Sequence, residues 1–175
     1  MITANSKMTI IRTVFAVIVF FFPVAEGGAD QKYLLHNDAK VEDAETGLVW
    51  AIDAGTPSFK DCAGGKKTYP EAVDYVTCLN FNNYLGHGDW RLPSPQELSS
   101  LISVLAHQYK KEHTHEIAGP KLRELGFNTI QPSLYWSRSV TDEVALAVEV
   151  LTSGEFHPIG KLNALYVWPV RGGAR

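Results

Sequence analysis

Cysteine is scarce in this 175-residue chain, which contains only Cys62 and Cys78. The net charge is only −3, so the strongly basic surface that nucleic-acid binding requires is missing. The sequence also lacks a glycine-rich phosphate loop and a nucleophile elbow, and no ordered spacing of serine, histidine and aspartate indicates a catalytic triad. We therefore expect no enzyme activity, no cofactor and no nucleic-acid partner.

Long hydrophobic runs are missing as well. The longest apolar stretch, residues 13–24, is shorter than the roughly 20 residues that span a bilayer. Lys7 and Arg12 precede this stretch, and small residues follow it at Ala25, Gly27, Gly28 and Ala29. A positive end, a short apolar core and a small-residue cleavage region are typical of a secretory signal peptide. The sequence predicts a signal peptide over residues 1–29 and an exported domain over 30–175, periplasmic or extracellular and without a membrane span after cleavage. The alternative is an uncleaved anchor.

Both cysteines lie within the predicted exported domain. An even number of cysteines in an exported chain favours a disulfide, and closing a loop of this size stabilises a fold by about 3 kcal/mol. The alternatives are a metal-binding pair and a reactive thiol. Two cysteines this far apart, with no histidine at ligand spacing beside either, make a poor zinc site. We expect a Cys62–Cys78 disulfide.

Residues 88–98 carry the most specific local pattern of the chain. Asp89 and Arg91 alternate with Trp90 and Leu92, so in an extended segment each pair faces its own side. Pro93 ends that segment. We expect Asp89, Trp90, Arg91 and Pro93 to form a structural motif, because charged groups that are partly buried need partners.

Helix starts are marked twice by the same pattern. Ser94 is a good N-cap, Pro95 suits the first helical position, and Glu97 completes a capping box. Thr68 and Glu71 form a second box ahead of an apolar face that runs to Leu79. Residues 40–43 and 48–51 form a candidate hairpin, and further strands are expected at 135–137, 144–151 and 165–170. A short helix is expected at 121–125, and residues 107–120 are expected to be irregular. The fold class predicted is α+β, with two helices packed with short antiparallel strands.

The ordered motifs resemble those of one family. Those motifs are residues 41–50, the helix that carries Cys78, residues 89–98, residues 135–137 and the final stretch 166–173. In this order they are similar to the Lcl C-terminal domain family, also called DUF1566, which is found in exported bacterial proteins. The resemblance implies a C-type-lectin-like fold, related to that of the formylglycine-generating enzymes. Those enzymes depend on cysteines near the C-terminus, and no cysteine follows Cys78.

The same resemblance implies a class of ligand. The domain that gives the family its name belongs to a surface adhesin and is associated with binding sulfated glycosaminoglycans. We expect a non-catalytic module that recognises an anionic polysaccharide or another cell-envelope component. The alternatives are a structural envelope protein acting through protein–protein contacts and, third, a hydrolase with two convergent carboxylates. The oligomeric state is not indicated.

Candidate contact residues fall mainly between the Ser94 helix and Tyr135. The lysines and the arginine of this segment could form a basic patch that binds sulfate or carboxylate groups. The alternative is ordinary solvated charge, because glutamates are interleaved with them. His113 and His115, with His107 upstream, could form a metal site or belong to a solvated loop. We favour the solvated loop, because the sequence fixes no third ligand. The four tryptophans lie in strand patterns, so most are expected in the core. The ligand-binding candidates are Lys110, Lys111, His113, His115, Lys121, Arg123 and Trp136.

Overall fold

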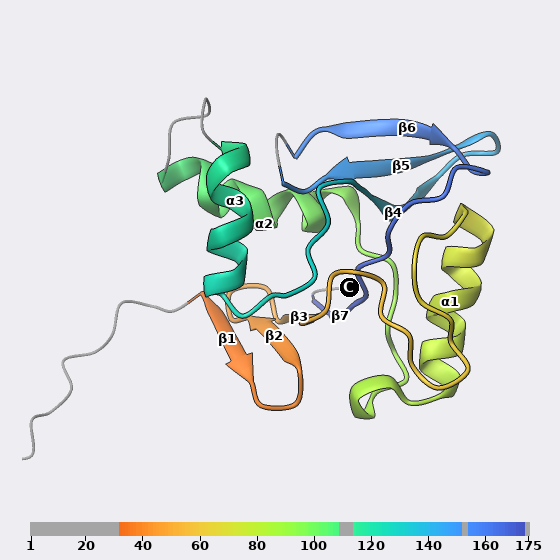
Figure 1. Cartoon of the computed structure of the whole chain (residues 1–175), viewed down its shortest axis with the longest axis horizontal. Coiled ribbons are helices and arrows are strands. Elements are labelled where there is room, and N and C mark those ends of the chain that lie inside the picture. The colour runs from red at the N-terminus through yellow and green to blue at the C-terminus, as the bar shows by residue number, and fades with distance from the viewer. Residues whose placement is uncertain (1–31, 109–113, 152–153, 174–175) are drawn as a thin grey trace, which may run out of the picture. The chain divides into compact units, whose positions relative to one another are not determined.

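The computed structural model describes residues 32–108, 114–151 and 154–173 (Figure 1). Three α-helices and one 3₁₀ helix lie in the part of the chain that it describes, together with seven strands. The helices are α1 (Tyr69–Phe81), η1 (Tyr84–Gly86), α2 (Pro95–Gln108) and α3 (Thr114–Glu124). The strands are β1 (Tyr33–His36), β2 (Lys40–Asp43), β3 (Leu48–Ala51), β4 (Leu134–Val140), β5 (Val144–Glu149), β6 (Phe156–Gly160) and β7 (Val170–Gly172).

The strands form two antiparallel sheets. One has the order β1-β2-β3-β7 and the other the order β4-β5-β6. The predicted hairpin is confirmed, because β2 pairs with β3 from Lys40 opposite Ala51 to Asp43 opposite Leu48. The α+β class is therefore confirmed, and the number of helices is corrected from two to three.

Both predicted helix starts are confirmed. The Glu97 side chain accepts a hydrogen bond from the Ser94 backbone N–H at 2.7 Å, and the Ser94 hydroxyl accepts one from the Glu97 N–H at 3.1 Å. At α1, the Glu71 carboxylate accepts from the Thr68 N–H at 2.8 Å. Each pair satisfies backbone groups that a helix end leaves without an internal partner.

The expected strand at 165–170 is wrong for most of its length. Only Val170 belongs to a strand, and isolated bridges at Leu165 and Tyr166 replace the rest. The reason is a side chain that takes the place of a neighbouring strand. The buried Thr56 hydroxyl donates to the Val167 carbonyl at 3.1 Å and accepts from the Val167 N–H at 2.7 Å. Val167 thereby satisfies its backbone without joining a sheet.

The irregular segment expected at 107–120 is also corrected in part. α2 extends to Gln108, and α3 begins at Thr114, well before the short helix expected at 121–125. Gly119 and Pro120 lie inside α3 and disfavour a helix by propensity. Tertiary packing overrides them, because Ala118 and Leu122 are fully buried in the core.

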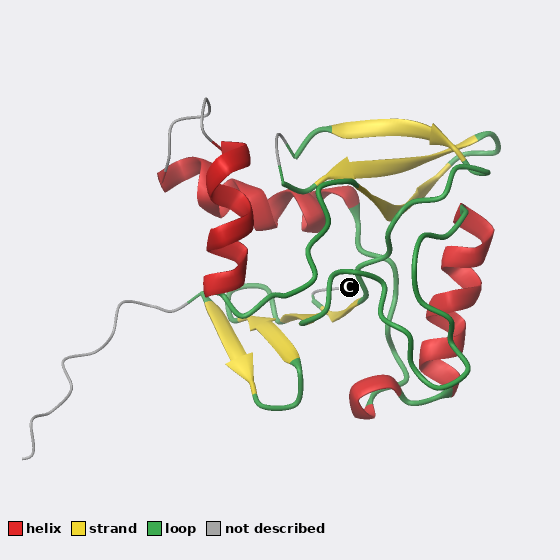
Figure 2. Ribbon diagram, in the orientation of Figure 1, coloured by secondary structure: helices red, strands yellow, loops and turns green. Residues whose placement is uncertain are grey.

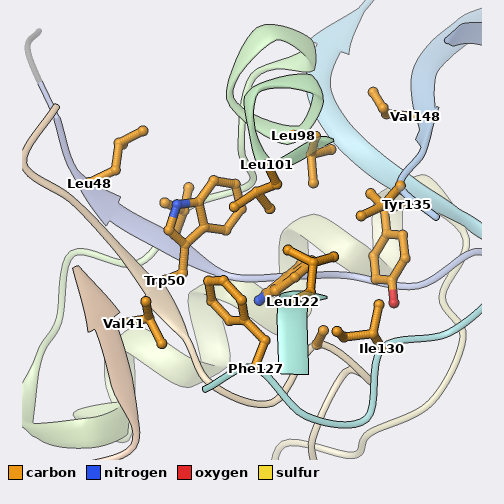
Figure 3. Close-up of a cluster of buried hydrophobic side chains, with 14 of the residues drawn as sticks. Val41, Leu48, Trp50, Leu98, Leu101, Leu122, Phe127, Ile130, Tyr135 and Val148 are labelled. Atoms are coloured by element: carbon orange, nitrogen blue, oxygen red, sulfur yellow. The ribbon is translucent and has the colours of Figure 1, made fainter. Parts of the chain in front are cut away.

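The core consists of two clusters. The larger one packs both sheets against α2 and α3, and Figure 3 shows Trp50, Leu122, Phe127 and Tyr135 converging within it. Aromatic rings meet edge to face there, with the Trp50 and Trp168 centroids 5.5 Å apart. The second cluster packs α1 and η1 against Trp136 and the strand residues beside it. These clusters hold the helices on either side of a set of long loops (Figure 2).

The predicted signal peptide lies outside the described residues. Among the residues that are described, no helix combines the length and the hydrophobicity needed to cross a bilayer.

Candidate functional site

The motif around Arg91 forms a structural joint. The Arg91 guanidinium donates to both oxygens of Glu97, at 2.8 and 2.9 Å, and to the Gly172 carbonyl at 3.0 Å. Because Glu97 also caps α2, one arginine joins the start of that helix to the end of β7. A two-pronged guanidinium–carboxylate pair is among the stronger polar contacts in proteins.

The other members of this motif are also held in place. The Trp90 ring is buried, and its indole N–H donates to the Tyr84 carbonyl at 2.8 Å. The Pro93 carbonyl accepts from the Arg138 N–H at 2.7 Å. Asp89 accepts two hydrogen bonds from Arg171. Each of the four residues of the motif thus has a partner within the fold.

The Glu97 carboxyl group makes the stability pH-dependent. Burial alone would raise the pKa of Glu97, but the hydrogen bonds from Arg91 and from the Ser94 N–H outweigh burial and leave this pKa below its usual value. A pKa that is lower in the folded than in the unfolded state adds stability above the unfolded-state pKa, about 4.5. This stability is lost as the pH falls through the folded-state pKa.

We therefore expect Glu97→Gln to flatten the pH dependence of unfolding below about pH 4.5. Urea unfolding of both proteins from about pH 7 to pH 3 measures this. Stability curves that stay parallel across that range would contradict the assignment.

The structure describes only part of the predicted basic and histidine segment. Lys110, Lys111 and His113 lie outside the described residues. His115 falls within α3, and its side chain is also outside the description. The two remaining candidates are in the last turn of α3. There Lys121 forms an ion pair with Glu124 at 2.5 Å, while Arg123 is exposed.

Trp136 does not present a surface for a ligand. It is fully buried, its ring packs edge to face on Tyr69, and its indole N–H donates to the Lys67 carbonyl at 2.8 Å. The expected contact between Trp136 and a ligand is thus corrected, because burial leaves no free ring face. All four tryptophans belong to the core, as most of them were expected to.

The Cys62–Cys78 disulfide is confirmed, with the two Cα atoms 5.7 Å apart. A shallow hollow of about 260 Å³ lies beside it. Two of the charged groups that line the hollow serve the fold. Glu71 caps α1, and Lys67 donates to the Gly64 carbonyl at 2.7 Å. We therefore look elsewhere for a recognition surface.

Three long loops lie side by side between α3 and α1 (Figure 2). They are residues 52–68, 125–133 and 161–169. Isolated bridges pair Asp53 with Asn128 and Lys67 with Leu165, and a third pairs Tyr166 with Tyr135 of β4. We give the name loop face to the exposed and half-buried polar and aromatic side chains that these loops carry. It consists of Asp53, Lys66, Asn128, Thr129, Gln131 and Tyr166.

The polar members of the loop face are each anchored through one atom. Asp53 Oδ1 accepts from the Gly55 N–H at 2.7 Å and from the Thr129 hydroxyl. That hydroxyl also contacts Asn128 Oδ1 at 2.9 Å. Gln131 Nε2 donates to the Thr129 carbonyl at 2.8 Å. Within the described residues, no contact is recorded for Asp53 Oδ2, Asn128 Nδ2 or Gln131 Oε1. The side chains that carry these atoms are thus oriented by the protein.

The aromatic member of the loop face is Tyr166. Its ring is half-buried and lies 5.9 Å from the Tyr135 ring, and the Tyr135 hydroxyl accepts from the Gln131 N–H at 2.7 Å. The exposed Lys66 ammonium lies 5.2 Å from the Tyr166 ring centroid. A ring and a cation therefore lie together here, and the buried Tyr135 links the ring to the Gln131 backbone.

Backbone strain occurs at Thr129, one of six described non-glycine residues with positive φ. Thr129 has φ of +50°, a left-handed conformation that is unusual for a β-branched residue. Such strain persists only where the surroundings impose it, and it concentrates at binding and catalytic sites. Here the hydrogen bond to Asp53 holds the strained residue.

Sequence reasoning missed most of the loop face. It placed recognition in the loops before Tyr135, which include Asn128, Thr129 and Gln131, but it named none of these residues and assigned Tyr166 to a strand. The signal available was the polar cluster that follows the buried Phe127. The contribution of Asp53 comes from a loop far away in the sequence and needs the fold.

Among the described side chains, no group of three histidine, cysteine, aspartate or glutamate residues is arranged to hold a metal ion.

A comparison with protein families matches residues 39–171 to the Lcl C-terminal domain. No curated protein matches the chain.

Proposed function

Because the chain belongs to the Lcl C-terminal domain family, we propose that it is an exported, non-catalytic module that binds a polysaccharide or another cell-envelope component through its loop face. A C-type-lectin-like fold is part of this proposal. Export is supported by the signal-peptide pattern before residue 30 and by the disulfide, since disulfides persist in oxidising compartments.

The observation that carries the proposal is the combination at Tyr166. Sugar rings present apolar faces rimmed by hydroxyl groups, so they bind where an aromatic ring adjoins fixed donors and acceptors. Asp53 and Gln131 provide acceptors, and Asn128 provides a donor, each already oriented by the fold. Lys66 adds a positive charge for a uronic acid or sulfate group. An anionic or partly anionic glycan satisfies all of these groups together.

The test is binding of the oxidised chain to sulfated, uronic-acid and neutral glycans, at low and physiological salt. We expect Tyr166→Leu to weaken binding about tenfold, which corresponds to the loss of one stacking contact. Phe81→Leu is the matched control, because Phe81 is 90% exposed on α1 and lies outside the loop face. Lys66→Gln should weaken binding mainly at low salt.

A second set of variants separates the loop face from the basic patch expected from sequence. Neutralising Lys110, Lys111, Lys121 and Arg123 together should leave most of the binding intact if the loop face is the site. Loss of all binding in that variant, with Tyr166→Leu unaffected, would move the site to α3. If the chain binds none of these glycans at either salt concentration, the proposal is rejected.

A structural envelope protein acting through protein–protein contacts is the second candidate. It is favoured by exposed apolar side chains on and just after the sheet β4-β5-β6, where Val140 is 47% and Leu162 is 86% exposed. A groove of about 160 Å³ adjoins Val140 and Thr141. Cross-linking in cells that is lost in a Val140→Ser, Leu162→Ser variant but kept in Tyr166→Leu would favour this candidate.

A further inference from the structure

The hollow beside the disulfide exposes the two cysteines unequally. Cys62 is buried, with 2% of its surface exposed, whereas Cys78 is half-buried. Both cysteines line the hollow, whose volume is about 260 Å³. This volume is several times that of one water molecule, about 30 Å³ in the liquid, so the hollow admits a small molecule. The rate at which a thiol opens a disulfide depends on access to the sulfur, and access is greater at Cys78.

The surroundings of the two sulfurs differ as well. Cys78 lies in the last turn of α1, where the helix dipole places partial negative charge and disfavours a thiolate. The Asn82 side-chain amide donates to Cys62 Sγ at 3.5 Å and to Cys78 Sγ at 3.6 Å. An amide that already contacts Cys62 Sγ can stabilise the negative charge that develops there when the S–S bond breaks. Both differences favour attack at Cys78, with Cys62 as the leaving sulfur.

The charge of the lining distinguishes between thiols. Three exposed carboxylates, those of Asp61, Glu71 and Asp74, line the hollow. Among the described residues of the lining, Lys67 is the one cation, and its ammonium donates to the Gly64 carbonyl at 2.7 Å. Three negative charges and one positive charge leave the lining with a formal charge of −2 at neutral pH. The lining therefore repels an anionic thiol and attracts a cationic one, most strongly at low salt.

We propose that the Cys62–Cys78 disulfide is a site of thiol–disulfide exchange that accepts small cationic thiols in preference to anionic ones. The attacking thiolate sulfur bonds to Cys78 Sγ, and the bond between the two cysteine sulfurs breaks. Its electron pair goes to Cys62 Sγ, which takes a proton from water and becomes a thiol. The attacking sulfur is oxidised and Cys62 is reduced, so the reaction needs no other oxidant or reductant. The site shares no residue with the loop face and does not depend on the function proposed there.

The experiment treats the oxidised full chain with cysteamine, 2-mercaptoethanol and 2-mercaptoethanesulfonate, which are small thiols with a positive, a neutral and a negative substituent. The reaction is stopped at early times by acid and alkylation, and mass spectrometry assigns each adduct to a cysteine. Each rate is divided by the rate of the same thiol with an uncharged model disulfide. This normalisation removes the differences in thiolate fraction and nucleophilicity between the thiols.

We expect the normalised rate for cysteamine to exceed that for 2-mercaptoethanesulfonate about tenfold at low salt, and the ratio to fall as salt is added. The adduct should lie on Cys78. A double variant, Asp61→Asn with Asp74→Asn, should abolish the preference, because the charges that remain in the lining cancel. Asp142→Asn changes an exposed aspartate between β4 and β5, and this matched control should keep the preference.

The same reactions in urea show whether the folded hollow causes the preference, because the three normalised rates should become nearly equal once the chain is unfolded. Equal rates in the folded chain at low salt, an adduct on Cys62 or a preference that survives the double variant would overturn the proposal. A folded chain that reacts with none of the thiols, under conditions in which the unfolded chain reacts, would also overturn it. Tyr166→Leu should leave the preference unchanged, which separates the fate of this site from that of the loop face.

Discussion

Reducing the Cys62–Cys78 disulfide is expected to lower the free energy of unfolding by about 3 kcal/mol. The bond closes a loop with a sequence separation of 16 residues, and the chain-entropy model gives this value for a loop of that size. The loop before α1 has little regular structure of its own, so the bond is a main restraint on its position. The Asn82 side chain ends α1 beside the same bond, donating to the Cys78 carbonyl at 3.2 Å.

Urea unfolding with and without a reducing agent measures this effect. A Cys62→Ala, Cys78→Ala variant should show the same loss and should no longer respond to the reducing agent. Equal stability of the oxidised and reduced chains would show that the bond adds nothing to the fold.

Arg91→Ala is expected to destabilise the fold by about 3 kcal/mol. The Arg91 and Glu97 side chains are 27% and 19% exposed, so removing the guanidinium leaves a largely buried carboxylate without its cation. The Gly172 carbonyl loses its arginine donor in the same step. The start of α2 and the end of β7 would then lose their shared contact.

Arg91→Lys should restore only part of this loss, because an ammonium cannot donate to both carboxylate oxygens in the planar geometry of a guanidinium. Arg123→Ala is the matched control at an exposed arginine in α3 and should change stability by less than about 0.5 kcal/mol. Chemical unfolding of the three variants makes the comparison. An Arg91→Ala protein as stable as the Arg123→Ala protein would contradict the structural role given to this motif.

The parts of the fold that sequence predicts well are those with local causes. The Ser94 capping box, the hairpin from Lys40 to Ala51 and the disulfide each follow from residues close together in the chain or from cysteine count alone. The errors have distant causes. α3 forms despite Pro120 because Leu122 packs into the core, and the chain at Val167 leaves the sheet because Thr56 satisfies its backbone.

For the candidate sites too, sequence predicts what has a local cause and misses what depends on distant parts of the chain. Sequence pointed to the loops before Tyr135 because of the basic and histidine residues at 107–123, and Asn128 and Gln131 lie further along the same stretch. It kept Trp136 as a ligand contact although the strand pattern favoured the core, and burial of that ring depends on α1 covering it. The cysteine count predicts the disulfide, whereas the unequal burial of its two cysteines depends on how the loop before α1 packs.

The pairing of β3 with β7 has a consequence for how the chain reaches its folded state. Leu48 lies opposite Gly172, so the first sheet is complete only when the last described residues join it. Contacts between segments so far apart in sequence form slowly, because the intervening chain must first be brought to order. Under the export proposed above, a chain threaded across a membrane from its N-terminus would finish folding only after its last residues have crossed. Until then β3 has an open edge, and chaperones of the receiving compartment would have time to act on it.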